Sequence, residues 1–168
     1  MDIQIFQYNE SHLAEIRIVL NEYLTYIAKE LTSPPWNFNL GEENEVNFTM
    51  NNLDKFSAHD GRLLLISVNG EIAGTISLRK IREDAGEIKR MYVKPMFRGK
   101  KLGNLLIEEV IKISEENDFS KLYLDTAHFM SSAISLYKKF GFEETTSYPE
   151  SVIPKDLLKK MIFMMKEL

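Results

Sequence analysis

A short turn in the middle of this chain gathers the residue types that bind phosphate. Four cations crowd it, namely Lys94, Arg98, Lys100 and Lys101, although the chain has a formal net charge of -4. Gly99 and Gly103 lie among them, and a helical pattern begins at Leu102. The free N–H groups of a helix N-terminus point toward an anion, and the helix dipole favours it. Residues 98–104 are therefore predicted to bind phosphate; the alternative is a basic loop that merely starts a helix.

The composition excludes several kinds of chemistry. The chain has no cysteine, so disulfides, thiolate metal sites and a cysteine nucleophile are excluded. His12, His59 and His128 share no ligand spacing, so no metal site is predicted. With 168 residues, 44% of them hydrophobic and 27% charged, residues 1–168 are expected to form a single globular domain.

The sequence shows no sign of export or membrane insertion. The N-terminus lacks a basic stretch followed by an apolar one, so no signal peptide is expected. No apolar run approaches the roughly 20 residues that span a bilayer. We therefore expect a soluble cytoplasmic protein. Its pI of about 5.5 argues against general nucleic-acid binding.

The first part of the chain predicts a short strand at residues 3–8 followed by a long helix. Apolar residues recur at helical spacing from Leu13 to Leu31, and Ser11 can cap this helix. The Ser-Pro-Pro sequence at 33–35 ends it. No clear period follows, and a second short helix over 43–53 is our prediction there.

Three strands are predicted next, and the third contains an irregularity. Apolar runs at 63–68 and 72–78 flank Asn69-Gly70, the strongest short hairpin signal. Residues 79–86 are polar and turn-like, and 88–93 form the third strand.

Within that third strand, the side-chain period slips. Met91 and Val93 share one face, whereas Ile88 falls on the other. A β-bulge between Ile88 and Met91 would place all three inward.

The second half alternates strands and helices. The predicted elements are a helix at 102–117, a strand at 121–126, a helix from a Ser131 cap to Phe140 closed by Gly141, and strands at 142–148 and 160–168. The strand–helix–strand unit over 88–126 implies two parallel strands. The hairpins imply antiparallel neighbours, so the fold is an α/β (α+β) domain with a mixed sheet.

Two motifs resemble the GCN5-related N-acetyltransferase (GNAT) superfamily. R-G-K-K-L-G at 98–103 is similar to its Arg/Gln-x-x-Gly-x-Gly/Ala motif, and A-I-S-L-Y-K-K-F-G-F at 133–142 is similar to A-x-x-L-Y-x-x-x-G-F. E-I-K-R-M-Y-V at 87–93 resembles a bacterial branch of uncharacterised small acetyltransferases. Two residues depart from the pattern: Lys101 stands where the family usually has glycine, and Met130 where many members have asparagine.

This resemblance implies a mostly antiparallel, twisted sheet of about six or seven strands with about four helices, whose central strands are parallel and splayed. It implies acetyl-coenzyme A as acyl donor, with its pyrophosphate on the turn and its pantetheine arm beside residues 91–93. An N–H freed by the bulge would face the thioester oxygen. The implied coenzyme-binding residues are Met91, Tyr92, Val93, Arg98, Gly99, Lys100, Lys101, Leu102, Gly103, Asn104, Ser131, Ser132 and Lys139.

The resemblance also implies two catalytic residues. Tyr137 is the predicted general acid, because a phenol can donate a proton to the departing thiolate. Glu87 is the predicted general base, taking a proton from the acceptor ammonium directly or through water. The alternatives are a core tyrosine with a satisfied hydroxyl and a solvated glutamate at a strand end.

The acceptor site is expected in the variable first part of the chain. Its predicted residues are Tyr26, Glu30, Trp36, Phe38 and Glu45, which could present aromatic and acidic surface to a cationic amine. The alternative is a hydrophobic patch that covers the sheet.

The function predicted from these motifs is acetyl transfer to a primary amine by direct attack in a ternary complex. The acceptor would be a small-molecule amine or amino acid, or less readily a protein amine. A non-catalytic acyl-coenzyme A sensor is the alternative. The sequence leaves open whether the chain is a homodimer, with the apolar segment Met161–Met165 in a subunit contact or in the core.

Overall fold

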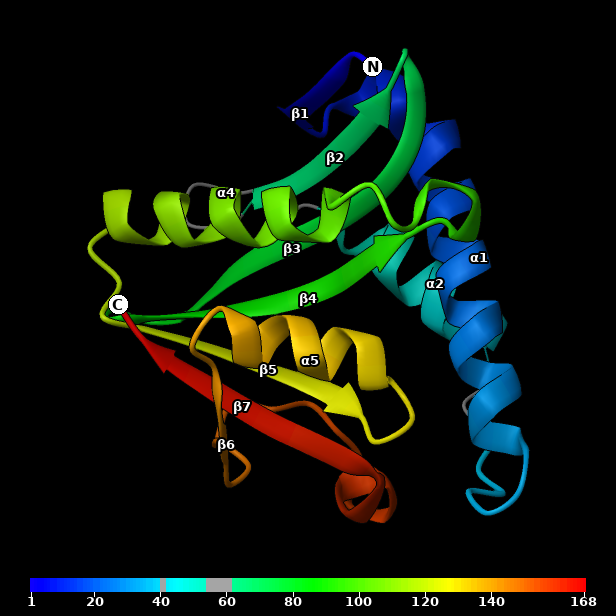
Figure 1. The fold of residues 1–168 in the computed structure, drawn as a ribbon. Helices are drawn as coiled ribbons and strands as arrows, with labels where there is room; N and C mark the ends of the chain where they lie inside the picture. The colour runs from blue at the N-terminus through cyan, green and yellow to red at the C-terminus, as the bar shows by residue number, and fades with distance from the viewer. Residues whose placement is uncertain (40–41, 54–61) are drawn as a thin grey trace.

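One seven-stranded sheet organises the chain, in the order β1-β2-β3-β4-β5-β7-β6 (Figure 1). The computed structural model describes residues 1–39, 42–53 and 62–168, and only the backbone of 42–46. The strands are β1 (Ile3–Gln7), β2 (Arg62–Val68), β3 (Glu71–Arg82), β4 (Ala85–Val93), β5 (Lys121–Ala127), β6 (Glu143–Thr145) and β7 (Met161–Glu167). Neighbouring strands are antiparallel except β4 and β5, which are parallel. The predicted mixed sheet is confirmed.

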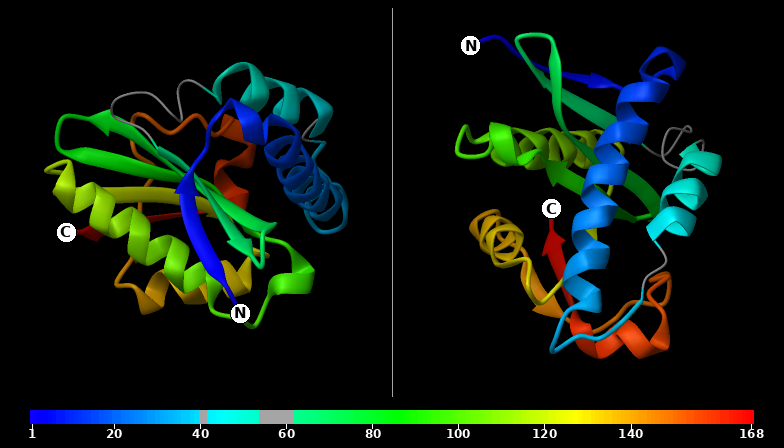
Figure 2. Two further views of the ribbon diagram at one scale, coloured as in Figure 1. Left: turned by 90° about the horizontal axis from the view of Figure 1, so that it is seen from above. Right: turned by 90° about the vertical axis from the view of Figure 1, so that its right-hand side faces the viewer.

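Helices cover both faces of this sheet. They are α1 (Leu13–Thr32), α2 (Glu42–Asn51), α4 (Leu102–Glu116) and α5 (Ser131–Lys139), with short 3-10 turns η1 (Glu10–His12), η2 (Pro95–Phe97) and η3 (Lys155–Lys160). Figure 2 shows α1 and α2 on one face and α4 and α5 on the other. In the described part of the chain, no helix has the length and apolar character needed to cross a membrane.

The sequence of β2 explains why the sheet has a core on each side. Side chains alternate between the two faces of a strand. Leu64 and Ile66 pack with Leu106 of α4, while Leu63 and Leu65 join the cluster of α1. Because both faces are apolar, β2 reads as a continuous hydrophobic run rather than an alternating one.

The predicted β-bulge lies in β4 and is confirmed. Thr75 pairs with Tyr92 and Ser77 pairs with Lys89, so β4 contains one more residue than β3 between these pairs. Arg90, in the bulge, has φ 53°. Gly74 lies opposite, and a Cβ there would come within 2.4 Å of the Tyr92 carbonyl oxygen. Glycine is therefore required at 74 for the two strands to approach each other beside the bulge.

The bulge coincides with a separation of the two parallel strands. Pairing between β4 and β5 runs from Ala85–Lys121 to Ile88–Leu124 and then stops. Figure 1 shows β4 and β5 diverging toward their carboxyl ends. The central strands are thus parallel and splayed, as the family resemblance implied.

Two predictions in the first half were wrong in detail. Asn9, not Ser11, is the capping residue: its side chain accepts the Ser11 N–H, and α1 begins only at Leu13. Residues 79–86 are mostly strand, with the turn confined to Glu83 and Asp84. Their polar side chains pair across the strands, as Arg79 does with Glu87, so polarity there does not mark a loop.

Two details in the second half also differ. Ser131 is the first residue of α5, and no side chain caps that helix. β6 is shorter than predicted, because the chain beyond Thr145 leaves the sheet and Tyr148 folds under it against Phe163. β7 lies inside the sheet with Phe163 and Met164 buried, which accounts for its apolar composition without a subunit contact. Gly141 closes α5 as predicted, with φ 83°.

Candidate active site

The largest set of predicted site residues meets in one cavity of about 460 Å³ at the open end of the splayed strands. It is bounded by the β4 bulge, the turn after β4 and the start of α5. The predicted residues that line it are Tyr26, Met91, Tyr92, Val93, Arg98, Gly99, Lys101, Leu102, Gly103, Asn104, Ser131 and Ser132. Phe97, Phe129, Met130, Ala133 and Leu136 also line it and were not predicted.

Two predicted cations do not line this cavity. The Lys100 ammonium lies over the Phe97 ring at 5.2 Å, and the Lys139 ammonium lies over the Phe140 ring at 5.8 Å. Lys139 is at the far end of α5 from the cavity. Arg98 does line it, and its Nε donates to the Val93 carbonyl oxygen at 3.1 Å. Fewer cations therefore line the cavity than the number of basic residues in the sequence suggested.

The turn itself presents a row of available backbone donors. Gly99 has φ 77° and Lys101 has φ 59°, in the left-handed region. Within the described residues, the N–H groups of 99–103 donate to no protein acceptor, whereas the next one, of Asn104, bonds back to the Lys101 carbonyl. This is the arrangement that binds a phosphate at a helix N-terminus. Lys101 adopts the conformation that glycine finds easier, as its departure from the family motif suggested.

Gly103 keeps the cavity open beside the helix. A Cβ at this position would lie 3.0 Å from a Leu136 methyl group and 3.2 Å from the Met91 methyl group. Any side chain at 103 would therefore crowd the wall that separates the turn from the bulge.

A second, smaller cavity of about 50 Å³ adjoins the bulge. It shares Met91, Met130 and Ala133 with the larger one. Its polar lining consists of Tyr23, Lys89, Arg90, Asp125, Thr126 and Tyr137. The smaller cavity thus places a group of titratable side chains beside residues that also line the larger one.

Tyr137 is buried and lines the smaller cavity. Its hydroxyl donates to the Met91 sulfur at 3.3 Å. Burial raises the pKa of Tyr137 well above its usual value, and the neighbouring Tyr23 and Asp125 raise it further. The hydroxyl therefore keeps its proton at neutral pH and can act as a donor.

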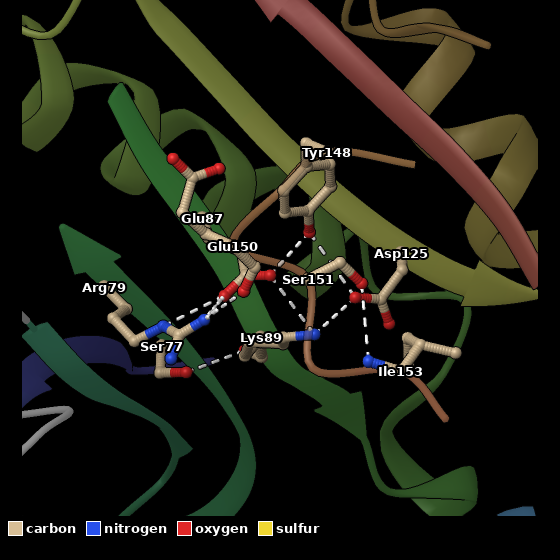
Figure 3. Close-up of polar contacts among 9 residues, drawn as sticks. All are labelled: Ser77, Arg79, Glu87, Lys89, Asp125, Tyr148, Glu150, Ser151 and Ile153. Carbon is tan, nitrogen blue, oxygen red and sulfur yellow. Dashed lines mark hydrogen bonds and ion pairs between the residues drawn. The ribbon is translucent and has the colours of Figure 1, made fainter. Parts of the chain in front are cut away.

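Glu87 is fully buried and lines neither cavity. Figure 3 shows the network around it. Arg79 Nε donates to Glu87 Oε2 at 3.0 Å, and the Tyr148 hydroxyl donates to Oε1 at 2.5 Å. Lys89 Nζ lies 3.3 Å from the same Oε1. Both carboxylate oxygens are engaged, so a direct contact between Glu87 and an acceptor amine is disfavoured.

Lys89 continues the network to Asp125 on β5, with which it forms an ion pair. The Tyr148 hydroxyl also lies 3.4 Å from Asp125 Oδ2. Sequence reasoning missed Asp125 and Tyr148, because nothing local marks a residue in the middle of a strand or in a loop after it. The signal that could have found Asp125 is one charged residue in an otherwise apolar strand, L-Y-L-D-T-A.

The predicted acceptor residues are dispersed. Tyr26 lines the larger cavity, but Glu30 lines neither. Trp36 stacks on His128 with ring centroids 6.1 Å apart, and the Lys160 ammonium lies 5.4 Å from the Phe38 ring centroid. Trp36 and Phe38 thus join the first part of the chain to the β5–α5 loop and η3. The side chain of Glu45 lies outside the described residues, as does His59.

No ligand set for a metal is evident in the part of the chain that the structure describes, where no three His, Asp or Glu side chains cluster suitably. The polar groups of the two cavities include backbone N–H groups, tyrosines and the Lys89–Asp125 pair.

Comparison with known proteins shows which family this chain is similar to. Residues 24–142 match the model described as the acetyltransferase (GNAT) family. An uncharacterized N-acetyltransferase of Schizosaccharomyces pombe is 32% identical over 144 residues, which cover 84% of this chain and 83% of that protein. An IAA acetyltransferase of Azospirillum brasilense is 31% identical over 93 residues, or 55% of this chain and 61% of the relative.

The fold is similar to that of a solved N-acetyltransferase. The crystal structure of PaiA N-acetyltransferase from Thermoplasma acidophilum, in complex with coenzyme A, has a TM-score of 0.78 at 20% identity and covers 100% of both chains. The fission-yeast relative means that membership of a bacterial branch is not confirmed. The chain belongs to the acetyltransferase (GNAT) family, and it is an N-acetyltransferase that uses acetyl-coenzyme A as its acyl donor.

Proposed function

We propose that this protein, acting as a single domain, transfers an acetyl group to a primary amine by direct attack in a ternary complex. The observation that carries the proposal is that the two cavities share Met91, Met130 and Ala133, with free backbone donors lining one cavity and Tyr137 and Asp125 lining the other. The chain has no cysteine to carry an acyl group, which favours direct transfer over a thiol-bound acyl enzyme.

The residues fit the coenzyme along its length. The N–H groups of 99–103 would hold its pyrophosphate, and the cavity-facing edge of β4 beyond the bulge would pair with its peptide-like arm. When bound, the donor supplies a thioester carbonyl carbon to an amine nucleophile. Tyr137 would hold a proton for the departing sulfur, since its hydroxyl already donates toward a sulfur atom.

Lys101 should act through its backbone rather than its charge. Lys101→Gly is expected to change the Kd for coenzyme A by less than about threefold, because the N–H and the left-handed conformation persist. Lys101→Val should destabilise the fold by about 1–2 kcal/mol, since a β-branched residue resists that conformation. Titration calorimetry and thermal melts measure the two effects. Binding weakened more than about tenfold by Lys101→Gly would instead assign the contribution to the ammonium.

The acceptor is proposed to be a small-molecule amine or an amino acid rather than a protein amine. The cavity beside Tyr137 and Asp125 is only about 50 Å³, which suits the end of a slender amine. The Azospirillum relative, named for acetylation of IAA, is compatible with a small acceptor.

A thiol-release screen tests the proposal. Purified protein, acetyl-coenzyme A and a panel of small amines, amino acids and amino-terminal peptides are combined, and free thiol is measured. We expect release that depends on the amine and is strongest for small amines. Tight coenzyme binding without release from any amine would favour the acyl-coenzyme A sensor and contradict the transferase.

A further inference from the structure

Lys89 and Asp125 occupy corresponding positions at the point where the sheet opens. The last pair of the β4–β5 ladder is Ile88 with Leu124, and these two residues follow it directly. Their side chains form an ion pair across the opening, with side-chain exposures of 10% and 7%. The pair therefore lies where the two parallel strands begin to separate, next to the bulge.

The two carboxylate oxygens of Asp125 have different hydrogen-bond surroundings. Its Oδ2 faces Lys89 and the Tyr148 hydroxyl. Among the residues that the structure describes, none donates a hydrogen bond to Oδ1, and that oxygen is not among the buried unpaired atoms. Asp125 lines the 50 Å³ cavity together with Tyr23 and Tyr137. In Figure 3, Lys89 and Tyr148 approach Asp125 from the side of Glu87.

The size of this cavity limits what can reach Asp125. A cavity of about 10–15 Å³ is enough to hold one water molecule. A space of about 50 Å³ therefore admits a small group of a few heavy atoms, such as a terminal amine and its first carbons.

The charges around the cavity favour loss of a proton from such an amine. Asp125 faces Lys89 from β4, Tyr148 from the segment after β6, Tyr23 from α1 and Tyr137 from α5. Arg79 and Glu87 complete the network behind Lys89. Arg90 also lines the cavity, so three cations stand against two carboxylates, and an arriving ammonium adds positive charge to a largely buried place that is already net positive. Release of its proton removes that charge.

We propose that Asp125 binds the ammonium of the acceptor and accepts the proton that it must lose before attack, a role that rests on the proposed acetyl transfer. One N–H bond of the ammonium breaks, and the proton passes to Asp125 Oδ1 and then to solvent. The neutral nitrogen bonds to the acetyl carbon, and the carbon–sulfur bond breaks. A second N–H bond of the nitrogen also breaks, and its proton replaces the one that Tyr137 gives to the departing sulfur.

The test compares two amines with the same two-carbon skeleton, ethylamine and trifluoroethylamine, of which only the first is an ammonium at neutral pH. Asp125→Asn keeps the size of the side chain and an oxygen for Lys89, so it should fold and bind coenzyme A as the parent does. Its kcat/KM for ethylamine should fall at least about a hundredfold, while that for trifluoroethylamine changes less than about threefold. Equal losses for both amines would overturn the proposal.

Glu87→Gln is the matched comparison. If it shows the loss confined to ethylamine and Asp125→Asn does not, Glu87 is the base and our assignment is wrong.

A measurement without turnover separates this proposal from the transferase itself. The carboxyl ¹³C resonance of Asp125 is followed by NMR while ethylammonium chloride is added to the protein with coenzyme A bound. We expect a saturating shift that sodium chloride does not produce, and absence of that shift would refute ammonium binding at Asp125. A shift without thiol release from any amine would uphold the ammonium site and contradict the proposed acetyl transfer.

Discussion

Glu87→Ala is expected to lower the free energy of unfolding by about 3 kcal/mol, the largest effect on stability that we predict. The substitution leaves the Arg79 guanidinium and the Tyr148 hydroxyl without the carboxylate that they share. Removing one partner of a buried ion pair costs about 3–5 kcal/mol. We expect the lower end, because Arg79 is 27% exposed and Lys89 keeps Asp125. Urea denaturation measures the change.

Glu83→Ala is the matched control for this prediction. Glu83 also pairs with a cation, Lys80 at 3.1 Å, but its side chain is 96% exposed. Exposed ion pairs contribute about 0–1 kcal/mol, so the control should change stability little. A similar small change for Glu87→Ala would mean that the buried network adds no net stability.

Tyr137→Phe is expected to reduce turnover at least about tenfold while coenzyme A still binds. Phenylalanine preserves the ring that packs on Phe142, with centroids 5.8 Å apart, and removes only the hydroxyl. The lost group is the one that can protonate the departing sulfur. Steady-state kinetics with the best amine of the thiol-release screen measure turnover, and calorimetry measures coenzyme binding.

Tyr123→Phe provides the control for hydroxyl removal elsewhere in the sheet. Tyr123 lies on β5 and packs on Tyr148 with ring centroids 4.8 Å apart, but it lines neither cavity. Its replacement should leave turnover within about twofold, as expected for a site without a transition-state contact. Unchanged turnover in Tyr137→Phe would remove Tyr137 from the mechanism.

Local signals in the sequence predicted much of the fold. The Asn69-Gly70 turn, the slipped period before Met91 and the glycine-closed helix at Gly141 each depend on a few adjacent residues, and each is present. The turn that we propose to bind phosphate is local in the same sense, since its strand, glycines and helix start are contiguous. Such features can be predicted from the sequence, because the backbone conformation at each of them depends on adjacent residues.

The polar network was not predictable in this way. Tyr148 and Glu87 are 61 residues apart, and Lys89 and Asp125 are 36 apart. Only the completed sheet brings these side chains together. The sequence therefore showed a charged strand end at Glu87, whereas packing makes it a buried ion pair. Likewise, the aromatic character of Trp36 suggested a ligand surface, but its ring is stacked on His128.

The short ladder between β4 and β5 has a consequence for how this enzyme can diverge. Backbone pairing joins the two halves of the sheet only from Ala85–Lys121 to Ile88–Leu124, and the Glu87–Lys89–Asp125 network spans the same join. Mutations there would alter acceptor chemistry and weaken the join together. New acceptor preferences are therefore more accessible through residues of α1, which take no part in this ladder or in its ion pairs.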